Sequence, residues 1–223
     1  MRPILWGVDV QADFMLPGGK LYVPDAEKII PNINRLVDQV RRGRTLLISS
    51  SDAHAPNDPE FRQWPPHCVK GTPGAELIPE GCSTRLLVVP NEPDFAFPKD
   101  LSAHQQILLE KNTLDVFDNP NTDRLLSWLN ALEEADAQPH FFVFGVVTEY
   151  CVFRAADGLL RRGHRISIIE DAIQSLNGKK AGAIVEELQA RGADLVFTDH
   201  ALALLKGNLT RPTEGELRRT AGN

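Results

Sequence analysis

Cysteine is scarce in this sequence. The 223 residues contain three, Cys68, Cys82 and Cys151, and their wide spacing fits neither a disulfide framework nor a zinc ribbon. Free thiols in an intracellular protein are the simpler interpretation. A chain of this length can bury a proper hydrophobic core, so it needs no covalent cross-links to fold.

Long apolar runs and an excess of positive charge are also missing. The N-terminal stretch MRPILWGVDV reaches the acidic Asp9 before it can form a signal-peptide core or a membrane span. The formal net charge of -6 argues against a nucleic-acid surface, because such surfaces cluster lysine and arginine. These absences predict a cytoplasmic protein without a membrane or nucleic-acid partner.

Short apolar runs alternate along the chain with stretches of helical periodicity. The runs are ILWGVDV, TLLISSS, HFFVFGVV, RISIIEDA and ADLVFTD. Helices are expected at 25–44, with Gly43 as the stop, and near 121–135, 149–162 and 179–191. This alternation predicts a doubly wound α/β fold, with a mainly parallel sheet and helices on both faces.

One domain is expected over residues 1–205. The proline-rich stretch from 81 to 104 fits the alternation poorly and is expected to be a long excursion with a short strand at RLLVV. The polar segment 206–223 is expected to be loosely ordered or held by a partner subunit, which leaves a homo-oligomer open.

Polar residues follow three of the predicted strands. Asp9 ends the first run, Asp52 and His54 end the second, and Cys151 follows the run at 141–147. In parallel α/β sheets the functional groups gather beyond the carboxyl ends of the strands. We therefore expect these residues to converge on one edge of the sheet.

Cys151, in the stretch VFGVVTEYCV, is the first candidate for chemistry. If Thr148 caps the helix that follows, Cys151 lies in its first turn, where the amide dipoles favour a thiolate. A thiolate beside outward-pointing N–H groups would combine a nucleophile with an oxyanion site. The alternative is a buried structural cysteine, which is common in proteins.

Asp9 interrupts an apolar strand, which is costly unless the carboxylate lies at the strand end or is paired. It could be a turn residue that bonds nearby amides. It could also be a general base beside the thiol, with its pKa set by a cation. Lys111 ends another apolar run and is the natural cation, although it could instead be an ordinary exposed lysine.

Asp52, His54 and His67 form a candidate metal site. Asp52 and His54 are two residues apart, so they point to the same side of an extended strand end. His67 follows a turn-rich loop that could fold back. One carboxylate and two imidazoles suit Zn²⁺, Fe²⁺ or Mn²⁺ with positions open for water or substrate. The Asp-x-His pattern alone is frequent and therefore a weak signal.

Four ordered stretches resemble one protein family. VDVQADFMLPGGKL, SSDAHAPN, WPPHCVKGTPGAEL and GVVTEYCV are similar to motifs of the isochorismatase-like cysteine hydrolases, and most similar to the nicotinamidase branch. The resemblance covers most of the chain. It implies a catalytic triad of Asp9, Lys111 and Cys151. It also implies a cis peptide bond from Val146 to Val147, and an oxyanion hole formed by the amides of Val147 and Cys151.

The nicotinamidase branch adds one divalent metal ion, Zn, Fe or Mn, which maps onto Asp52, His54 and His67. Glu60 stands where it could serve as a further ligand, directly or through water. The activity implied is conversion of nicotinamide to nicotinate and ammonia through a Cys151 thioester.

Three aromatic residues are candidates for the substrate pocket. By resemblance, Phe14 and Trp64 would clamp a flat heteroaromatic ring, and Phe117 is a further candidate. Ordinary core packing is the alternative for all three rings.

The chain departs from the family pattern at three places. Glu149 stands where aspartate is usual, and Asn112 follows Lys111 where glycine is common. Residues 79–110 are longer than in compact nicotinamidases and are expected to form an insertion, either a lid over the site or an oligomer contact. Because lids help to choose substrates, this insertion bears on the identity of the substrate.

Three other functions stay open at this point. A sibling hydrolase could use the same triad on another small amide, ureide or vinyl ether. A metallohydrolase could rely on Asp52, His54 and His67, with Cys151 in the core. A non-catalytic binding module could keep the scaffold alone. The effects of chelation and of a Cys151→Ala substitution on activity distinguish these alternatives.

Overall fold

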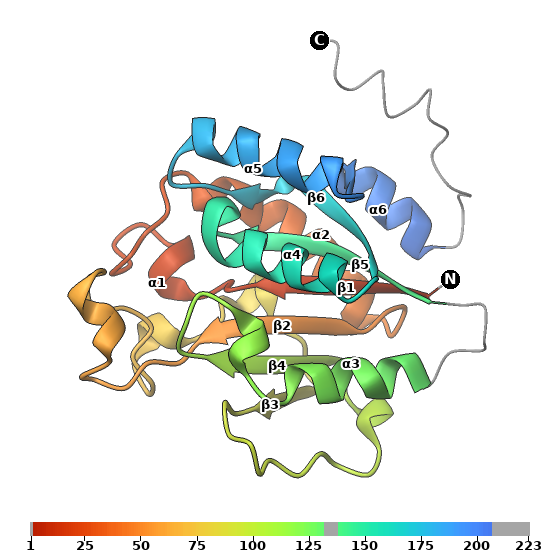
Figure 1. Cartoon of the computed structure of the whole chain (residues 1–223), viewed down its shortest axis with the longest axis horizontal. Coiled ribbons are helices and arrows are strands. Elements are labelled where there is room, and N and C mark those ends of the chain that lie inside the picture. The colour runs from red at the N-terminus through yellow and green to blue at the C-terminus, as the bar shows by residue number, and fades with distance from the viewer. Residues whose placement is uncertain (1, 132–137, 207–223) are drawn as a thin grey trace.

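The structure is a computed structural model that describes residues 2–131 and 138–206. Its centre is a seven-stranded sheet in the order β3-β4-β2-β1-β5-β6-β7, with every adjacent pair parallel (Figure 1). The strands are β1 (Arg2–Val8), β2 (Leu47–Asp52), β3 (Leu86–Val89), β4 (Gln106–Lys111), β5 (Pro139–Val146), β6 (Arg165–Gln174) and β7 (Asp194–Val196).

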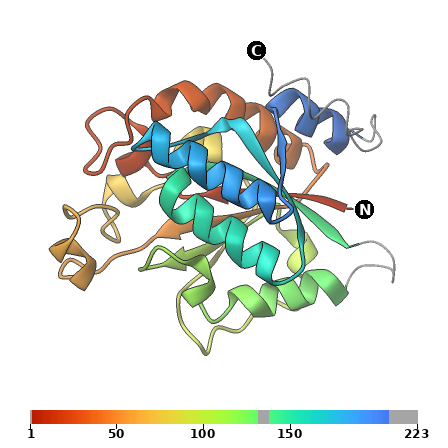
Figure 2. The same cartoon turned by 45° about the horizontal axis from the view of Figure 1, so that its top comes forward.

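Helices cover both faces of this sheet. They are α1 (Ala12–Met15), α2 (Ile30–Arg41), α3 (Thr122–Ala131), α4 (Phe153–Arg161), α5 (Gly178–Ala190) and α6 (Thr198–Leu205). Figure 2 shows helices on both faces of the sheet. Side chains of α3, α4 and α5 belong to one buried apolar cluster, and those of α2 and α6 belong to the other. The predicted doubly wound α/β fold is confirmed, because a parallel sheet must bury both of its faces.

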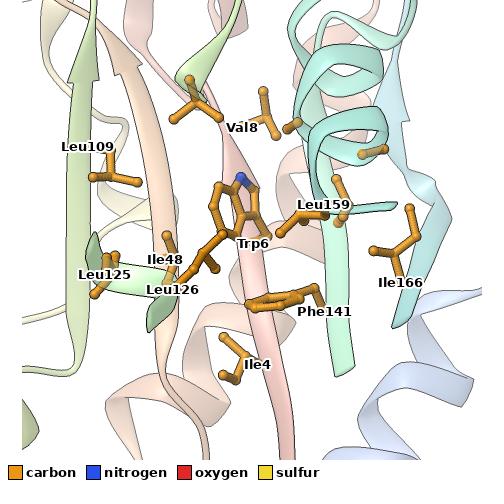
Figure 3. Packing of buried hydrophobic residues seen from close by; sticks show 14 of the residues in the cluster. Ile4, Trp6, Val8, Ile48, Leu109, Leu125, Leu126, Phe141, Leu159 and Ile166 are labelled. Carbon is orange, nitrogen blue, oxygen red and sulfur yellow. The ribbon is translucent and has the colours of Figure 1, made fainter. Parts of the chain in front are cut away.

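Successive side chains of β1 point into opposite apolar clusters. Ile4 and Trp6 of β1 face the cluster under α3 to α5, whereas Leu5 faces the opposite cluster. Trp6 and Phe141 of the neighbouring β5 meet edge to face, with ring centroids 5.6 Å apart (Figure 3). Burying a side chain such as Phe141 contributes about 1.5–3 kcal/mol, so this layer supplies much of the driving force for folding.

Several element boundaries differ from those predicted. The helix expected at 25–44 begins at Ile30, after a 3₁₀ turn over Ala26–Ile29, because Pro31 suits the first turn of a helix and not its interior. It ends at Arg41, and Gly43 follows in the left-handed region, as expected of a stop. The run ADLVFTD supplies β7, but α6 begins at Thr198. Helices α1 and α6 were not predicted.

The segment 79–110 contributes two strands to the sheet, joined by a longer irregular stretch. It contains β3, where RLLVV predicts a strand, and most of β4. A role for the rest of this segment as a lid stays a prediction. Of the polar segment 206–223, residues 207–223 lie outside the described part of the chain. Across the described residues, none of the helices has the length and apolar character needed to cross a membrane.

The centre of the sheet is its topological switch point. From β1 the chain moves to β2 on one side, and β5, on the other side of β1, is followed by β6 and β7. The connections therefore diverge between β1 and β5, and this divergence opens a crevice beyond the carboxyl ends of the strands.

Candidate active site

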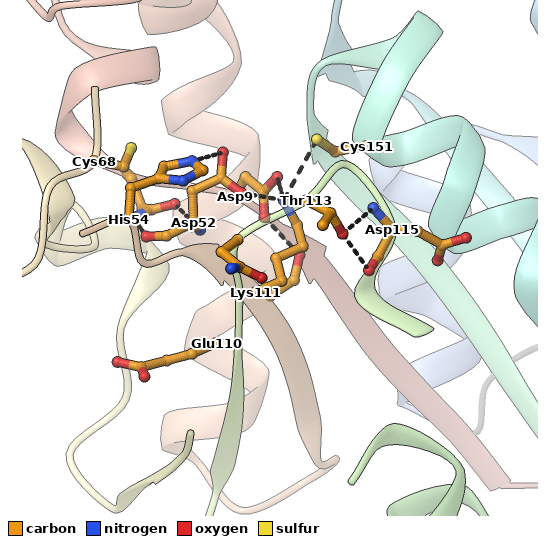
Figure 4. Close-up of polar contacts among 12 residues, drawn as sticks. Asp9, Asp52, His54, Cys68, Glu110, Lys111, Thr113, Asp115 and Cys151 are labelled. Carbon is orange, nitrogen blue, oxygen red and sulfur yellow. Dashed lines mark hydrogen bonds and ion pairs between the residues drawn. The ribbon is translucent and has the colours of Figure 1, made fainter. Parts of the chain in front are cut away.

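Lys111, the last residue of β4, reaches across the carboxyl edge of the sheet (Figure 4). Its Nζ lies 2.9 Å from Asp9 Oδ2 and donates to Cys151 Sγ at 3.5 Å. It also forms an ion pair with Asp52. The hydroxyl of Ser50 donates to the other oxygen of Asp9 at 2.6 Å. The structure thus brings Asp9, Lys111 and Cys151 together, although they are far apart in the sequence.

Burial governs the protonation of this group. It raises the pKa of the Asp9 carboxyl, against the opposing charge of Lys111. It likewise holds the pKa of the Cys151 thiol well above the ordinary value, with Lys111 again opposing. For Lys111 itself burial acts to lower the pKa, but Asp52 and Asp9 outweigh it and the pKa rises. The resting thiol therefore carries its proton and needs a base, and the nearby Asp9 carboxylate can accept that proton.

Cys151 does not lie in the first turn of a helix capped by Thr148, as the sequence predicted. It lies in a single π-turn, Thr148–Val152, that precedes α4. The Thr148 hydroxyl donates instead to the Gln174 carbonyl at 3.0 Å, so it ties the turn to β6. Wider turns of this kind occur often at functional sites, and this one holds the cysteine at the bottom of a cleft.

The peptide bond between Val146 and Val147 is cis, as expected. Val147 and Cys151 both line the cleft that contains Asp9. The assignment of their two amides to an oxyanion hole stays a prediction.

Asp52, His54 and His67 lie side by side, with one ligand atom from each within 4.8 Å of the others. Asp52 Oδ2 is 3.8 Å from His54 Nε2 and 3.5 Å from His67 Nε2. The His67 Nδ1–H donates to the Pro65 carbonyl at 2.8 Å, which orients the ring with Nε2 toward Asp52. The predicted loop return of His67 is confirmed.

These three residues fit a divalent metal ion. All are buried, and His54 Nε2 has no hydrogen-bond partner among the described residues. An unpaired polar atom in the interior is costly unless a ligand satisfies it. Two imidazoles and a carboxylate form a donor set that suits zinc, iron or manganese. Glu60 lines the same cleft, but its role as a ligand stays a prediction.

Phe14 and Trp64 line the same cleft as Cys151, as predicted. Phe117 does not line this cleft. Its ring is stacked with Trp6 at a centroid distance of 6.3 Å and lies under the Arg162 guanidinium at 3.7 Å. Gly158 leaves room for that ring, so Phe117 packs against α4 and not against the cleft.

Several walls of the cleft were not predicted from the sequence. Tyr150 meets Trp64 edge to face, with ring centroids 5.4 Å apart. Leu21, Leu114 and Leu176 close the remaining sides. The position of Tyr150, next to Cys151, was a usable signal, whereas the leucines come from separate loops and carry none.

The doubly wound sheet, the cleft at its carboxyl edge and the relatives described next together make this chain an α/β amidohydrolase. The chain belongs to the isochorismatase family, because the isochorismatase domain matches residues 4–82 and 85–200.

Relatives with assigned activities support this placement. The nicotinamidase of Escherichia coli (strain K12) is 26% identical over 211 residues, which cover 84% of this chain and 91% of that protein. The pyrazinamidase of Pyrococcus horikoshii, solved in complex with zinc, superposes with a TM-score of 0.68 and 26% identity over 88% of this chain and 99% of that one. N-carbamoylsarcosine amidase from Thermoplasma acidophilum has a TM-score of 0.66 and 26% identity, with 89% and 98% coverage.

Proposed function

We propose that this protein is a metal-dependent cysteine amidohydrolase that converts nicotinamide to nicotinate and ammonia. The observation that carries the proposal is the contact of one buried lysine with both Asp9 and Cys151, two residues that line a mostly apolar cleft. The similarity to nicotinamidases supplies the choice of substrate.

The reaction proceeds through a thioester. Asp9 accepts the thiol proton, and the sulfur of Cys151 forms a bond to the amide carbon. Lys111 stabilises the thiolate as it forms, and the amides of Val147 and Cys151 stabilise the oxyanion that the carbonyl oxygen becomes. Asp9 returns the proton to the nitrogen, and ammonia leaves. A water molecule, deprotonated by Asp9, then cleaves the thioester to release the acid and restore the thiol.

The metal would be held by Asp52, His54 and His67 beside the triad. When bound, a divalent ion supplies a fixed positive charge that attracts a lone pair of the substrate or of water. The chain's own contribution is positional, because Lys111 contacts both the ligand Asp52 and the nucleophile Cys151. The metal site and the thiol are therefore linked through one ammonium group.

Substrate entry requires side chains to move. The cleft has a volume of about 30 Å³, room for only about one or two water molecules. It adjoins an outer hollow of about 700 Å³, and the two share Glu60, Trp64 and Leu114 as walls. Trp64 and Leu114 are half-buried. Their rotation would admit a flat ring from the outer hollow.

The test is ammonia release from nicotinamide by the purified chain, before and after chelation and after metal is added back. We expect turnover that disappears with the metal and returns with it. Turnover that survives complete metal removal would refute the metal-dependent mechanism. Absence of turnover with metal confirmed bound would leave the cysteine hydrolase and remove nicotinamide as its substrate.

The same site could act on another small amide or ureide. The similarity to N-carbamoylsarcosine amidase, whose identity to this chain equals that of the zinc-bound pyrazinamidase, favours this second function. Release of ammonia from a carbamoyl compound, in place of nicotinamide, would identify it.

A further inference from the structure

The side-chain amide of Gln11 forms hydrogen bonds with both the N–H and the carbonyl of Asp52. Its Oε1 accepts from the Asp52 N–H at 2.7 Å, and its Nε2 donates to the Asp52 carbonyl at 2.8 Å. The same Nε2 donates to the Ala75 carbonyl at 2.8 Å. Gln11 is fully buried, and both of its Nε2 protons have acceptors. The function proposed above gives this residue no role.

Gln11 replaces a missing rung of the sheet. The pairing of β1 with β2 runs to Val8 and Ser50, and the Asp9 N–H still reaches the Ser50 carbonyl at 3.2 Å. Asp9 then takes a left-handed conformation with φ of 49°, and the chain turns away from the sheet. The next backbone groups on β2 belong to Asp52, and a strand would have paired with them. The amide of Gln11 does so instead, because it carries the same donor and acceptor as a peptide group.

Asp13, two residues along, makes the corresponding contact with the loop that carries His67. Its carboxylate accepts from the Cys68 N–H at 2.7 Å and from the Lys20 N–H at 2.9 Å. The Cys68 carbonyl accepts in turn from the His54 N–H at 3.1 Å. The peptide groups of Cys68 thus join His67, its neighbour in sequence, to the segment after β2 that carries His54.

We propose that Gln11 and Asp13 are positioning residues that set the spacing of the three candidate metal ligands. Gln11 fixes the end of β2 at Asp52, and Asp13 fixes the loop at Cys68, beside His67. Both belong to one short segment, which the chain places directly after the base Asp9. The inference rests on the metal site of the proposed function.

The physical basis is the precision that metal binding requires. The carboxylate of Asp52 lies on β2 and the imidazole of His67 lies on a loop. The chain between them does not fix their separation, which therefore depends on the contacts that hold each backbone. Losing the groups that orient metal ligands typically costs on the order of 10–100-fold in metal affinity. A purely structural glutamine would lower stability and leave metal affinity unchanged.

Gln106 provides a matched control. It is also fully buried, its Oε1 accepts from the Ser83 N–H at 2.7 Å, and its Nε2 donates to Ser49 Oγ at 2.9 Å and to the Gly81 carbonyl at 3.1 Å. It begins β4 and so lies at the opposite edge of the sheet from Lys111. Gln11→Met and Gln106→Met therefore remove similar sets of hydrogen bonds at opposite edges of the same sheet.

The experiment measures Zn²⁺ affinity of the full chain by competition with a chromophoric chelator, with the visible spectrum of bound Co²⁺ as a second readout. We expect Gln11→Met to weaken Zn²⁺ binding on the order of 10–100-fold and to alter the Co²⁺ spectrum. Gln106→Met should stay within about twofold of the parent affinity. Asp13→Asn should weaken binding in the same direction, because one of the two backbone N–H groups then faces an amide NH₂.

Gln11→Glu covers the case in which Gln11→Met does not fold. It is nearly isosteric and keeps the acceptor for Asp52 N–H, but it places an oxygen against the carbonyls of Asp52 and Ala75. Equal Zn²⁺ affinities for the Gln11 variants and Gln106→Met would overturn the positioning role. A parent chain that binds no Zn²⁺ would instead overturn the metal site, and the inference with it.

Discussion

The two ends of strand β1 have opposite character. Ile4 and Trp6 are fully buried among apolar side chains. Asp9, directly after the strand, is as well buried but belongs to a cluster of charged groups that includes Lys111 and Asp52. Removing such charges from water costs several kcal/mol per ion, which their mutual attraction repays only in part. The apolar middle of the sheet must therefore stabilise a carboxyl edge that contributes little to folding.

This difference predicts separable effects. Substitutions at the carboxyl edge should change turnover more than stability, and substitutions in the apolar middle should do the reverse.

Cys151→Ala gives the largest effect expected. Turnover should fall by at least roughly 10³-fold, because removal of a nucleophile leaves only binding and electrostatic stabilisation. The thermal midpoint should change little, since the substitution deletes one sulfur at the bottom of a cleft. Ammonia release and thermal unfolding measure the two quantities. Activity within tenfold of the parent, on the other hand, would favour the metallohydrolase in which Cys151 is core.

Lys111→Met is the expected exception, because it should reduce both turnover and folding stability. The substitution keeps the length of the side chain and leaves the carboxylates of Asp9 and Asp52 buried without their cation. Breaking a buried ion pair in this way costs about 3–5 kcal/mol of folding stability. Turnover should fall as well, and denaturant unfolding separates the two losses.

Adding Asp9→Asn to Lys111→Met removes one of the two stranded charges. The double variant should recover part of the lost stability and none of the activity. A Lys111→Met chain as stable as the parent would show that the carboxylates are already neutral in the folded protein.

Phe141→Ala tests the apolar middle of the sheet. Phe141 is fully buried against Trp6, and truncation of such a ring costs about 3–5 kcal/mol. Turnover per folded molecule should stay within about twofold of the parent, because the ring touches none of the cleft. Urea unfolding and active-site titration give these two values. A selective loss of kcat in a fully folded variant would contradict the separation.

The sequence predicted the sheet well because its strands are buried on both faces. Runs such as HFFVFGVV need no partner information to be recognised, and Asp9 and Cys151 stand out as polar residues at the ends of such runs. The convergence of Asp52 with His67 followed from the family resemblance as much as from spacing. The structure then placed their ligand atoms together.

The features that were missed depend on contacts across the chain. The π-turn that begins at Thr148 is tied to β6 by the bond from its hydroxyl to the Gln174 carbonyl. Phe117 is held away from the cleft by Arg162 and by the space at Gly158. Gln11 looks like an ordinary polar residue until β2 lies beside it. The spacing of apolar residues along the chain carries no information about these long-range contacts.

His164 gives the smallest effect and extends the comparison to pH. It is buried with its ring edge-to-face against Phe141, centroids 5.1 Å apart, and burial, aided by Arg162, lowers its pKa below the ordinary 6.5. As pH falls through that ordinary value, the unfolded chain takes up the proton first, so this residue's contribution to stability is present above it and lost below. His164→Phe keeps a ring against Phe141 and removes the titration. The drop in urea midpoint between about pH 7.5 and about pH 5.5 should be smaller in the variant than in the parent. An equal drop would show that the acid sensitivity comes from titratable groups other than His164.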